Sequence, residues 1–200
     1  RQSGLYAEPG IGGFYPTLAG YRELLSDSSL PEHAPSWKSE LFPETGVILR
    51  HGFPGPAETQ LHLIAGRNHA HYDYDSGSVT IWGKGRIVAD DFGYYGRAPA
   101  EDHNLVDASI AGNGEMTIDT FSASERFDYV SGRKQEWTRQ IAFVKDTDPL
   151  GPNYFVINDA FLAPARGHWR LWLTADSVTP QGNVVRVRGG ENVDTDIFFV

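Results

Sequence analysis

The sequence predicts an all-β protein built as a large antiparallel β-sandwich of two sheets. Its 22 glycines and 12 prolines separate short segments that are rich in Val, Ile, Thr, Phe and Trp. This alternation of turn residues with β-branched and aromatic residues is typical of strands and not of helices. A chain of 200 residues with 40% hydrophobic residues is long enough to bury a large core between two sheets.

The strands expected from this pattern follow one another at short, regular intervals along most of the chain. Their close spacing favours antiparallel neighbours joined by tight turns, which is the arrangement of a sandwich. The expected strands are residues 46–50, 60–65, 78–82, 86–90, 104–108, 115–122, 136–144, 154–162, 168–174, 183–188 and 195–200.

The first 40 residues have a different character. Segment 17–27, "TLAGYRELLSD", places Leu18, Tyr21, Leu24 and Leu25 at helical spacing, and a polar stretch follows it. We therefore expect residues 1–40 to form a linker with a short helix, ahead of a β domain at 41–200. The layout also predicts that the chain is part of a longer protein.

Composition excludes several classes of function. No stretch of about 18 apolar residues is present, and the first residues lack the layout of a signal peptide. The absence of cysteine excludes disulfides and thiolate sites, so a metal would need imidazole and carboxylate ligands. The net charge of -9 argues against nucleic-acid binding. An anionic substrate would require local cations such as Arg50, Arg67 or Arg97.

The hairpin "SVTIWGKGRIVAD" directs attention to Asp91. A three-residue loop centred on Lys84 would place Val79 opposite Ala89 and Gly77 opposite Asp91. Asp91 would then lie on the apolar face of the hairpin, whereas a two-residue turn would reverse the faces.

Continued outward, the same face carries His71, Asp73 and Asp75. In ideal pairing Asp73 would lie roughly 13 Å from the position of Asp91, so a bend or bulge near Gly77 is needed to bring both to one ion. The simpler interpretation is a solvated loop whose aspartates cap turns. His103 would supply the third group of a carboxylate and imidazole metal site.

Four segments together resemble the heparinase II/III-like family of polysaccharide lyases, and the resemblance covers about residues 40–200. They are "FPETGVILR" (42–50), "HYDYDSGSV" (71–79), "GRIVADDFGYYG" (85–96) and "HNLV" (103–106), and the closing "TDIFFV" is also similar. The resemblance implies an N-terminal helical toroid followed by an antiparallel β-sandwich, of which this chain would be nearly the whole. It also implies cleavage of uronic-acid-containing polysaccharides by β-elimination.

The resemblance assigns site residues in one of two registers. Without gaps, His71 takes the place of the histidine at the cleft, and Asp73, Asp91 and His103 take the places of the metal ligands. Asp73 then stands where the family has a histidine, so zinc is the first expectation and calcium or manganese are admissible. The other register uses His69 and His71 as the histidine pair, makes His71 a ligand, and needs a two-residue insertion before Ser78.

The resemblance also implies where the remaining parts of the active site lie. The family's catalytic tyrosine belongs to the helical domain, which would be a partner domain or subunit of this chain. Tyr94, Tyr95 and Arg97 are expected to bind the acidic polysaccharide. A secreted or periplasmic location is implied as well. No nucleic-acid or membrane partner is expected.

A second hypothesis belongs to a different class. The sandwich could be a non-catalytic carbohydrate-binding module, with Trp37, Trp82, Tyr94 and Tyr95 as stacking platforms.

Overall fold

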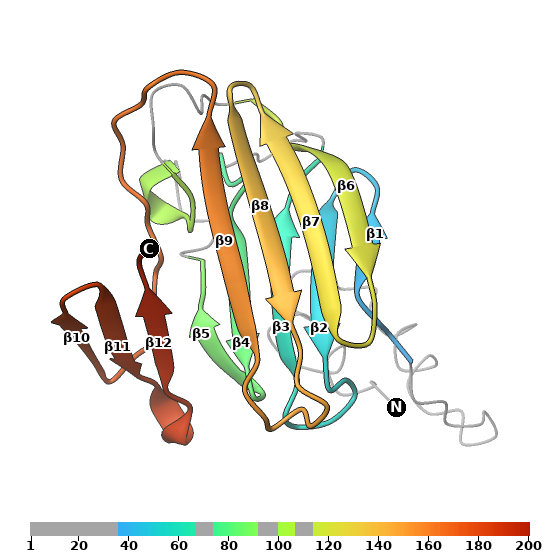
Figure 1. Ribbon diagram of the computed structural model, residues 1–200, viewed down its shortest axis with the longest axis vertical. Coiled ribbons are helices and arrows are strands. Elements are labelled where there is room, and N and C mark those ends of the chain that lie inside the picture. The colour runs from blue at the N-terminus through green and yellow to red at the C-terminus, as the bar shows by residue number, and fades with distance from the viewer. Residues whose placement is uncertain (1–35, 67–73, 92–99, 107–113) are drawn as a thin grey trace, which may run out of the picture. The chain divides into compact units, whose positions relative to one another are not determined.

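The described chain consists of antiparallel strands, which confirms the all-β prediction (Figure 1). The computed structural model describes residues 36–66, 74–91, 100–106 and 114–200. The predicted helix at 17–27 and most of the predicted linker lie outside these residues. Residues 36–200 belong to one structural unit, and all that follows concerns this unit.

The first sheet has five strands in the order in which they occur along the chain. They are β1 (Glu40–Phe42), β2 (Gly46–His51), β3 (Thr59–Ile64), β4 (Val79–Gly83) and β5 (Arg86–Ala89). Each strand pairs antiparallel with the next, so this sheet is a simple meander.

The second sheet is a four-stranded antiparallel meander, and a smaller three-stranded sheet follows it. The second sheet contains β6 (Thr117–Ala123), β7 (Phe127–Lys134), β8 (Trp137–Val144) and β9 (Tyr154–Phe161). The third contains β10 (Ser177–Gln181), β11 (Val184–Arg188) and β12 (Thr195–Phe198). Short 3₁₀ turns occupy Ala100–Asp102 and Gly190–Asn192. In the described part of the chain, no helix is long and apolar enough to cross a membrane.

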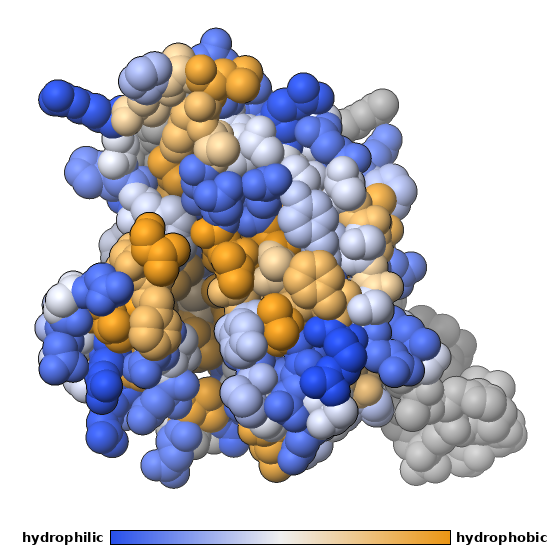
Figure 2. All heavy atoms as spheres, in the orientation of Figure 1, coloured by the Kyte–Doolittle hydropathy of each residue, from blue (hydrophilic) through white to orange (hydrophobic). Residues whose placement is uncertain are grey.

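The core lies between the two larger sheets, which form two layers in Figure 1. Alternate residues of each strand point inward, so β3 buries Leu61 and Leu63 while β8 buries Ile141 and Phe143. This sheet-on-sheet packing confirms the predicted sandwich. The outer surface of β6–β9 faces the viewer in Figure 2, where hydrophobic side chains gather over the middle strands.

Two predicted strands are wrong. Segments 104–108 and 168–174 make only the isolated bridges Val106–Trp169 and Ala89–Leu173 in their described parts. The reason is that the Asn104 side chain takes over backbone partners that a ladder would use. Its amide nitrogen donates to two backbone carbonyls, and its oxygen accepts from the backbone N–H of Trp172.

Three strands were not predicted, because each lacks an apolar run. β1 is only three residues long, and β10 contains a proline. β7, "FDYVSGRK", has Asp128, Gly132 and Lys134 at inward positions, yet it lies in the middle of its sheet. Its polar inward residues are paired with other buried groups, which the sequence alone does not show.

The register predicted for the β4–β5 hairpin is also wrong. Lys84 and Gly85 form a two-residue turn, with positive φ angles of 51° and 77°. Ala89 pairs with Ile81 and not with Val79, because the register shifts by one residue at a bulge between Ile81 and Trp82. The two-residue turn alone would have sent Asp91 to the outer face. The bulge reverses the alternation a second time, and Asp91 again faces inward.

Candidate functional site

Asp91 and His103 form a pair at the end of the first sheet. The Nδ1 atom of His103 lies 2.8 Å from Oδ1 and 2.9 Å from Oδ2 of Asp91. The His103 side chain is fully buried, and that of Asp91 is 18% exposed. The predicted neighbourhood of Asp91 and His103 is therefore present, although His103 follows a 3₁₀ turn and does not begin a strand.

Ser78 and Asn104 hold this pair in place. The Ser78 hydroxyl donates to Oδ2 of Asp91 at 3.4 Å and accepts from the backbone N–H of Asn104 at 3.0 Å. The Asn104 side chain donates to the carbonyls of Val79 at 2.7 Å and Asp90 at 2.8 Å. Since Asn104 and Asp90 directly adjoin the pair in sequence, these bonds fix the backbone on both sides of it.

The buried Arg139 side chain of β8 connects the backbone at Gly77 with the backbone at Asn104 from the core side of the site. Nη1 of Arg139 donates to the carbonyl of Gly77 at 2.7 Å and to that of Asn104 at 3.0 Å. Asp159 on β9 accepts from Nε and Nη2 of the same guanidinium at 2.8 and 2.9 Å, and from the indole of Trp137 at 2.8 Å. Arg139 is fully buried, so this bidentate pair compensates a charge that solvent cannot reach.

A second buried cation holds the turn that precedes Ser78. Nζ of Lys134 donates to the carbonyl of Ser76 at 2.9 Å, and the Ser76 hydroxyl accepts from the N–H of Met116 at 2.7 Å. Burial lowers the pKa of Lys134 to about 8, with the carboxylate of Asp75 acting in the opposite direction.

Residues 74–78 form a turn. The alternation of side chains between the two faces, which was predicted to extend from the strand back through Asp75, therefore ends at Ser78. Tyr74 and Gly77 have positive φ angles of 65° and 98°, and the N–H of Ser78 donates to the carbonyl of Asp75 at 2.7 Å. The bend near Gly77 that a shared ion would require is therefore present. The other predicted residues of the site lie outside the described residues, namely His69, His71, Asp73, Tyr94, Tyr95 and Arg97.

The described residues fit part of a divalent metal site. Asp91 and His103 supply a carboxylate and an imidazole at one point, which is the donor type that zinc and manganese accept. Their hydrogen-bonded supports from Ser78 and Asn104 resemble the outer contacts that orient metal ligands. Within the part of the chain that the structure describes, no group of three or more His, Asp or Glu residues is positioned to hold an ion.

Sequence reasoning did not identify Arg139, Asp159 or Lys134, although a signal for the first two was available. Arg139 alternates in step with Trp137, Ile141 and Phe143, so its charged side chain lies among the inward-facing core residues of β8. Asp159 likewise shares parity with the inward residues of β9. A charge in a core row predicts a buried ion pair with a structural or functional purpose.

Comparison with solved structures places the fold. A heparinase III aligns with a TM-score of 0.65 and 14% identity over 92% of this chain, and its form with methylated lysines gives 0.65 and 15%. A mutant of the heparan sulfate lyase HepC from Pedobacter heparinus gives 0.61 and 16%, also over 92%. The chain has the fold of the heparinase III sandwich. No protein-family model and no curated protein sequence matches it.

The fold agreement confirms the resemblance that four short segments predicted from the sequence. It covers nearly the whole of this chain but only 32% of the length of the first heparinase III structure. The chain thus spans about a third of the length of the structures it matches, and it shares their fold over that third.

Proposed function

We propose that this chain is the β-sandwich part of a polysaccharide lyase that cleaves uronic-acid-containing polysaccharide by β-elimination. The observation that carries the proposal is the buried Asp91–His103 pair, set by Ser78 and Asn104 at the end of a sandwich with the heparinase III fold. A buried imidazole beside a carboxylate, with Ser78 and Asn104 making four hydrogen bonds around the pair, is more than a solvated loop requires.

The proposed reaction removes the proton at C5 of a uronate, forms the double bond between C4 and C5, and breaks the bond from C4 to the glycosidic oxygen, which an acid protonates as it departs. In this scheme His71 faces the substrate, with His69 as the reserve candidate, and Tyr94, Tyr95 and Arg97 bind the polysaccharide. The base that takes the C5 proton would come from a tyrosine of a helical partner domain or subunit. This chain alone would then hold only part of the active site.

Asp73, Asp91 and His103 are the proposed ligands of a divalent metal, with His71 in reserve. Zinc is the first candidate because imidazole and carboxylate suit it, and calcium or manganese follow because two carboxylates make the site harder. A bound ion would supply positive charge that fixes the two segments carrying its ligands. Arg139 and Lys134 hold those same segments from inside the sandwich.

Heparan sulfate is the first acidic polysaccharide to test, because one of the similar structures is a heparan sulfate lyase. A secreted or periplasmic location is proposed, because the proposed substrate is a large polymer that would be degraded outside the cytoplasm. The decisive experiment mixes this chain with heparan sulfate, with and without the helical part of the same protein, and records the ultraviolet absorbance of the unsaturated product.

Product is expected only when both parts are present, and Asp91→Asn should reduce its rate of formation by at least about tenfold. Trp82→Ala, a substitution on the far side of β4 from the site, serves as the control. Activity of the isolated chain would show that the base lies within it. No product from the reconstituted pair with any uronate-containing polymer would overturn the proposed function.

A further inference from the structure

A pocket lies at the opposite end of the first sheet from Asp91 and His103. It encloses about 700 Å³ and is lined by the segments 37–39, 50–53, 123–126 and 145–147. β2 runs from Gly46, next to the candidate site through its pairing with Ile64, to His51 at this pocket. Five residues of strand separate its two ends by roughly 17 Å.

One wall of the pocket is aromatic. Trp37 stacks on Phe53 with ring centroids 5.2 Å apart, and the guanidinium of Arg50 lies 4.6 Å from the Phe53 ring and 5.5 Å from the Trp37 ring. Trp37 nevertheless remains 58% exposed. Its ring is held in place by its neighbours while much of its surface is open, which is the condition for stacking a sugar ring.

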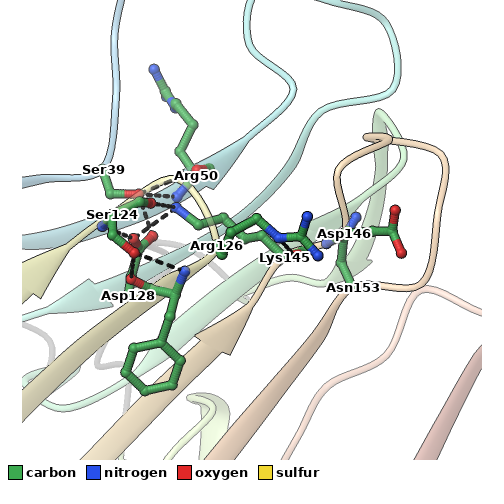
Figure 3. A network of polar contacts seen from close by, with 9 residues as sticks. Ser39, Arg50, Ser124, Arg126, Asp128, Lys145, Asp146 and Asn153 are labelled. Atoms are coloured by element: carbon green, nitrogen blue, oxygen red, sulfur yellow. Dashed lines mark hydrogen bonds and ion pairs between the residues drawn. The ribbon is translucent and has the colours of Figure 1, made fainter.

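The floor of the pocket is a buried polar network, shown in Figure 3. Nζ of Lys145 lies 2.7 Å from Oδ1 of Asp128, whose other oxygen accepts from the Ser39 hydroxyl at 2.5 Å. Asp128 and Lys145 are both almost fully buried. Arg50 is compensated in the same way by Glu58 at 2.8 Å. These pairs make the floor rigid and leave its charges balanced.

Arg126 and Lys38 supply the cations that remain. Nε of Arg126 donates to the carbonyl of Lys145 at 3.0 Å, and its terminal nitrogens have no partner among the described residues. Lys38 likewise has none in the described part of the chain. Of the two acidic residues of the lining, Asp146 accepts from Thr147 and from the N–H of Asp148. The bond from Asp148 and the nearby charge of Arg126 both lower the pKa of Asp146. Glu125 remains as a counter-charge.

His51 adds a polar atom that lacks a partner. Its Nε2 is buried and has no hydrogen-bond partner among the residues that the structure describes. Burial and the nearby charges of Lys145 and Lys84 lower the pKa of His51, so its imidazole is neutral at physiological pH. A hydrogen bond with the backbone of Asp146 acts in the opposite direction on this pKa, so the buried imidazole belongs to the rigid floor of the pocket.

We propose that this pocket binds an anionic sugar residue of an acidic polysaccharide. The sugar ring stacks on Trp37, and its carboxylate or sulfate contacts Arg126. The chain as a whole carries a net charge of -9, and the lining of this pocket is where four basic residues gather, namely Lys38, Arg50, Arg126 and Lys145. For contrast, a pocket of about 350 Å³ near Gly66 has Glu44 and Glu115 in its lining and no basic residue.

This inference rests on the proposed function only for the class of polymer, since the pocket lies far from Asp91. This pocket would be a second binding site for the polysaccharide that the lyase cleaves. The affinity for polymers long enough to reach both sites would therefore be higher than that for short ones.

The test is calorimetric titration of the 200-residue chain with a heparan sulfate tetrasaccharide, and with an uncharged cello-oligosaccharide of the same length. Binding of the acidic sugar alone is expected. Trp37→Ala and Arg126→Gln should each weaken it by about tenfold or more. Tyr154→Ala is the matched control, because Tyr154 is also an exposed aromatic residue, at 55%, but does not line the pocket.

Arg126→Gln keeps the proposal testable if Trp37→Ala disturbs folding, since Arg126 is exposed. Wild-type affinity in both variants, equal affinity for the uncharged sugar, or no binding by the wild type would each overturn the proposal. Asp91→Asn should bind the tetrasaccharide as the wild type does, although it should slow product formation by the chain combined with the helical part. The two proposals can therefore fail separately.

Discussion

Lys134 is an ammonium group held inside the sandwich with one carbonyl, that of Ser76, as its described partner. Its side chain is almost fully buried, and burial lowers its pKa from 10.5 to about 8. Between these two values the unfolded chain holds a proton that the folded chain has released. The free energy of unfolding should therefore rise with pH across this window.

The prediction is measured by urea unfolding of the wild type and of Lys134→Met at about pH 7 and about pH 10.5. The stability of the wild type relative to the variant should increase by about 2 kcal/mol over this range. Below pH 8 both states hold the proton, and the folded state carries the full cost of burying the charge. If the free energy of unfolding changed with pH by the same amount in the wild type and in Lys134→Met, the titration of Lys134 would not be the cause.

Arg139 makes a different contribution, because its charge is compensated by Asp159. Arg139→Met should lower the free energy of unfolding by about 3 kcal/mol or more, since it leaves a buried carboxylate without its cation. The double variant Arg139→Met/Asp159→Leu should recover part of the loss. Arg133→Met is the control, because the Arg133–Asp119 pair at 3.3 Å is exposed and should cost under about 1 kcal/mol. Chemical denaturation provides the measurement.

At the scale of the element, the turn at 74–78 depends on Gly77. Its φ angle is 98°, and a Cβ atom there would lie 2.6 Å from two ring atoms of Trp137. Gly77→Ala should therefore destabilise the chain by about 2 to 4 kcal/mol, combining backbone strain with a steric clash in the core. Gly182→Ala provides the matched control.

Gly182 has a φ angle of 63°, and no atom lies within 4 Å of the position of its added Cβ. That substitution should cost about 1 kcal/mol, from backbone strain alone. Equal losses for the two variants in thermal unfolding would show that Gly77 matters only for its backbone conformation, and not for its contact with Trp137.

Elements with a regular hydrophobic pattern were predictable. β2, β3, β8 and β9 were expected within one residue of their observed bounds, because each has apolar residues at most of its alternate, inward positions. β7 was missed because Asp128 and Lys134 occupy inward positions that look solvent-exposed in sequence. They are buried because Lys145 and Ser76 lie opposite them, and such long-range pairing has no local signature.

The candidate site was predictable where it depended on residue type and not where it depended on register. Asp91 was assigned to the inner face through a three-residue loop, yet the observed turn has two residues and a bulge restores the face. A bulge is set by the partner strand and by tertiary packing, so strand periodicity does not reveal it. The support from Arg139 likewise comes from a segment far away in sequence, and the Asn104 side chain bonds to the distant residues Val79 and Asp90.

At the scale of the whole unit, the sandwich connects the candidate site with its core. Arg139 lies in the same inward row as Phe143, and its guanidinium contacts the backbone beside both Ser78 and His103. An ion bound at Asp91 and His103 would therefore be held by the packed sheets and not by loops alone. Binding to the folded state only should raise the stability of the whole unit.

The resulting prediction concerns thermal unfolding after treatment with a chelator and after addition of zinc, manganese or calcium. The ion that occupies the site should raise the free energy of unfolding of the wild type by about 2.7 kcal/mol at a hundredfold excess over its dissociation constant. Asp91→Ala and His103→Ala should abolish this increase and also lower the metal content of the purified protein. Asp119→Ala, at an exposed position on β6, should leave both quantities unchanged.

Because the three ions differ in their preference for imidazole over carboxylate, the one that gives the largest increase identifies the character of the ligand set. An increase that persists in Asp91→Ala would place the ion elsewhere in the chain.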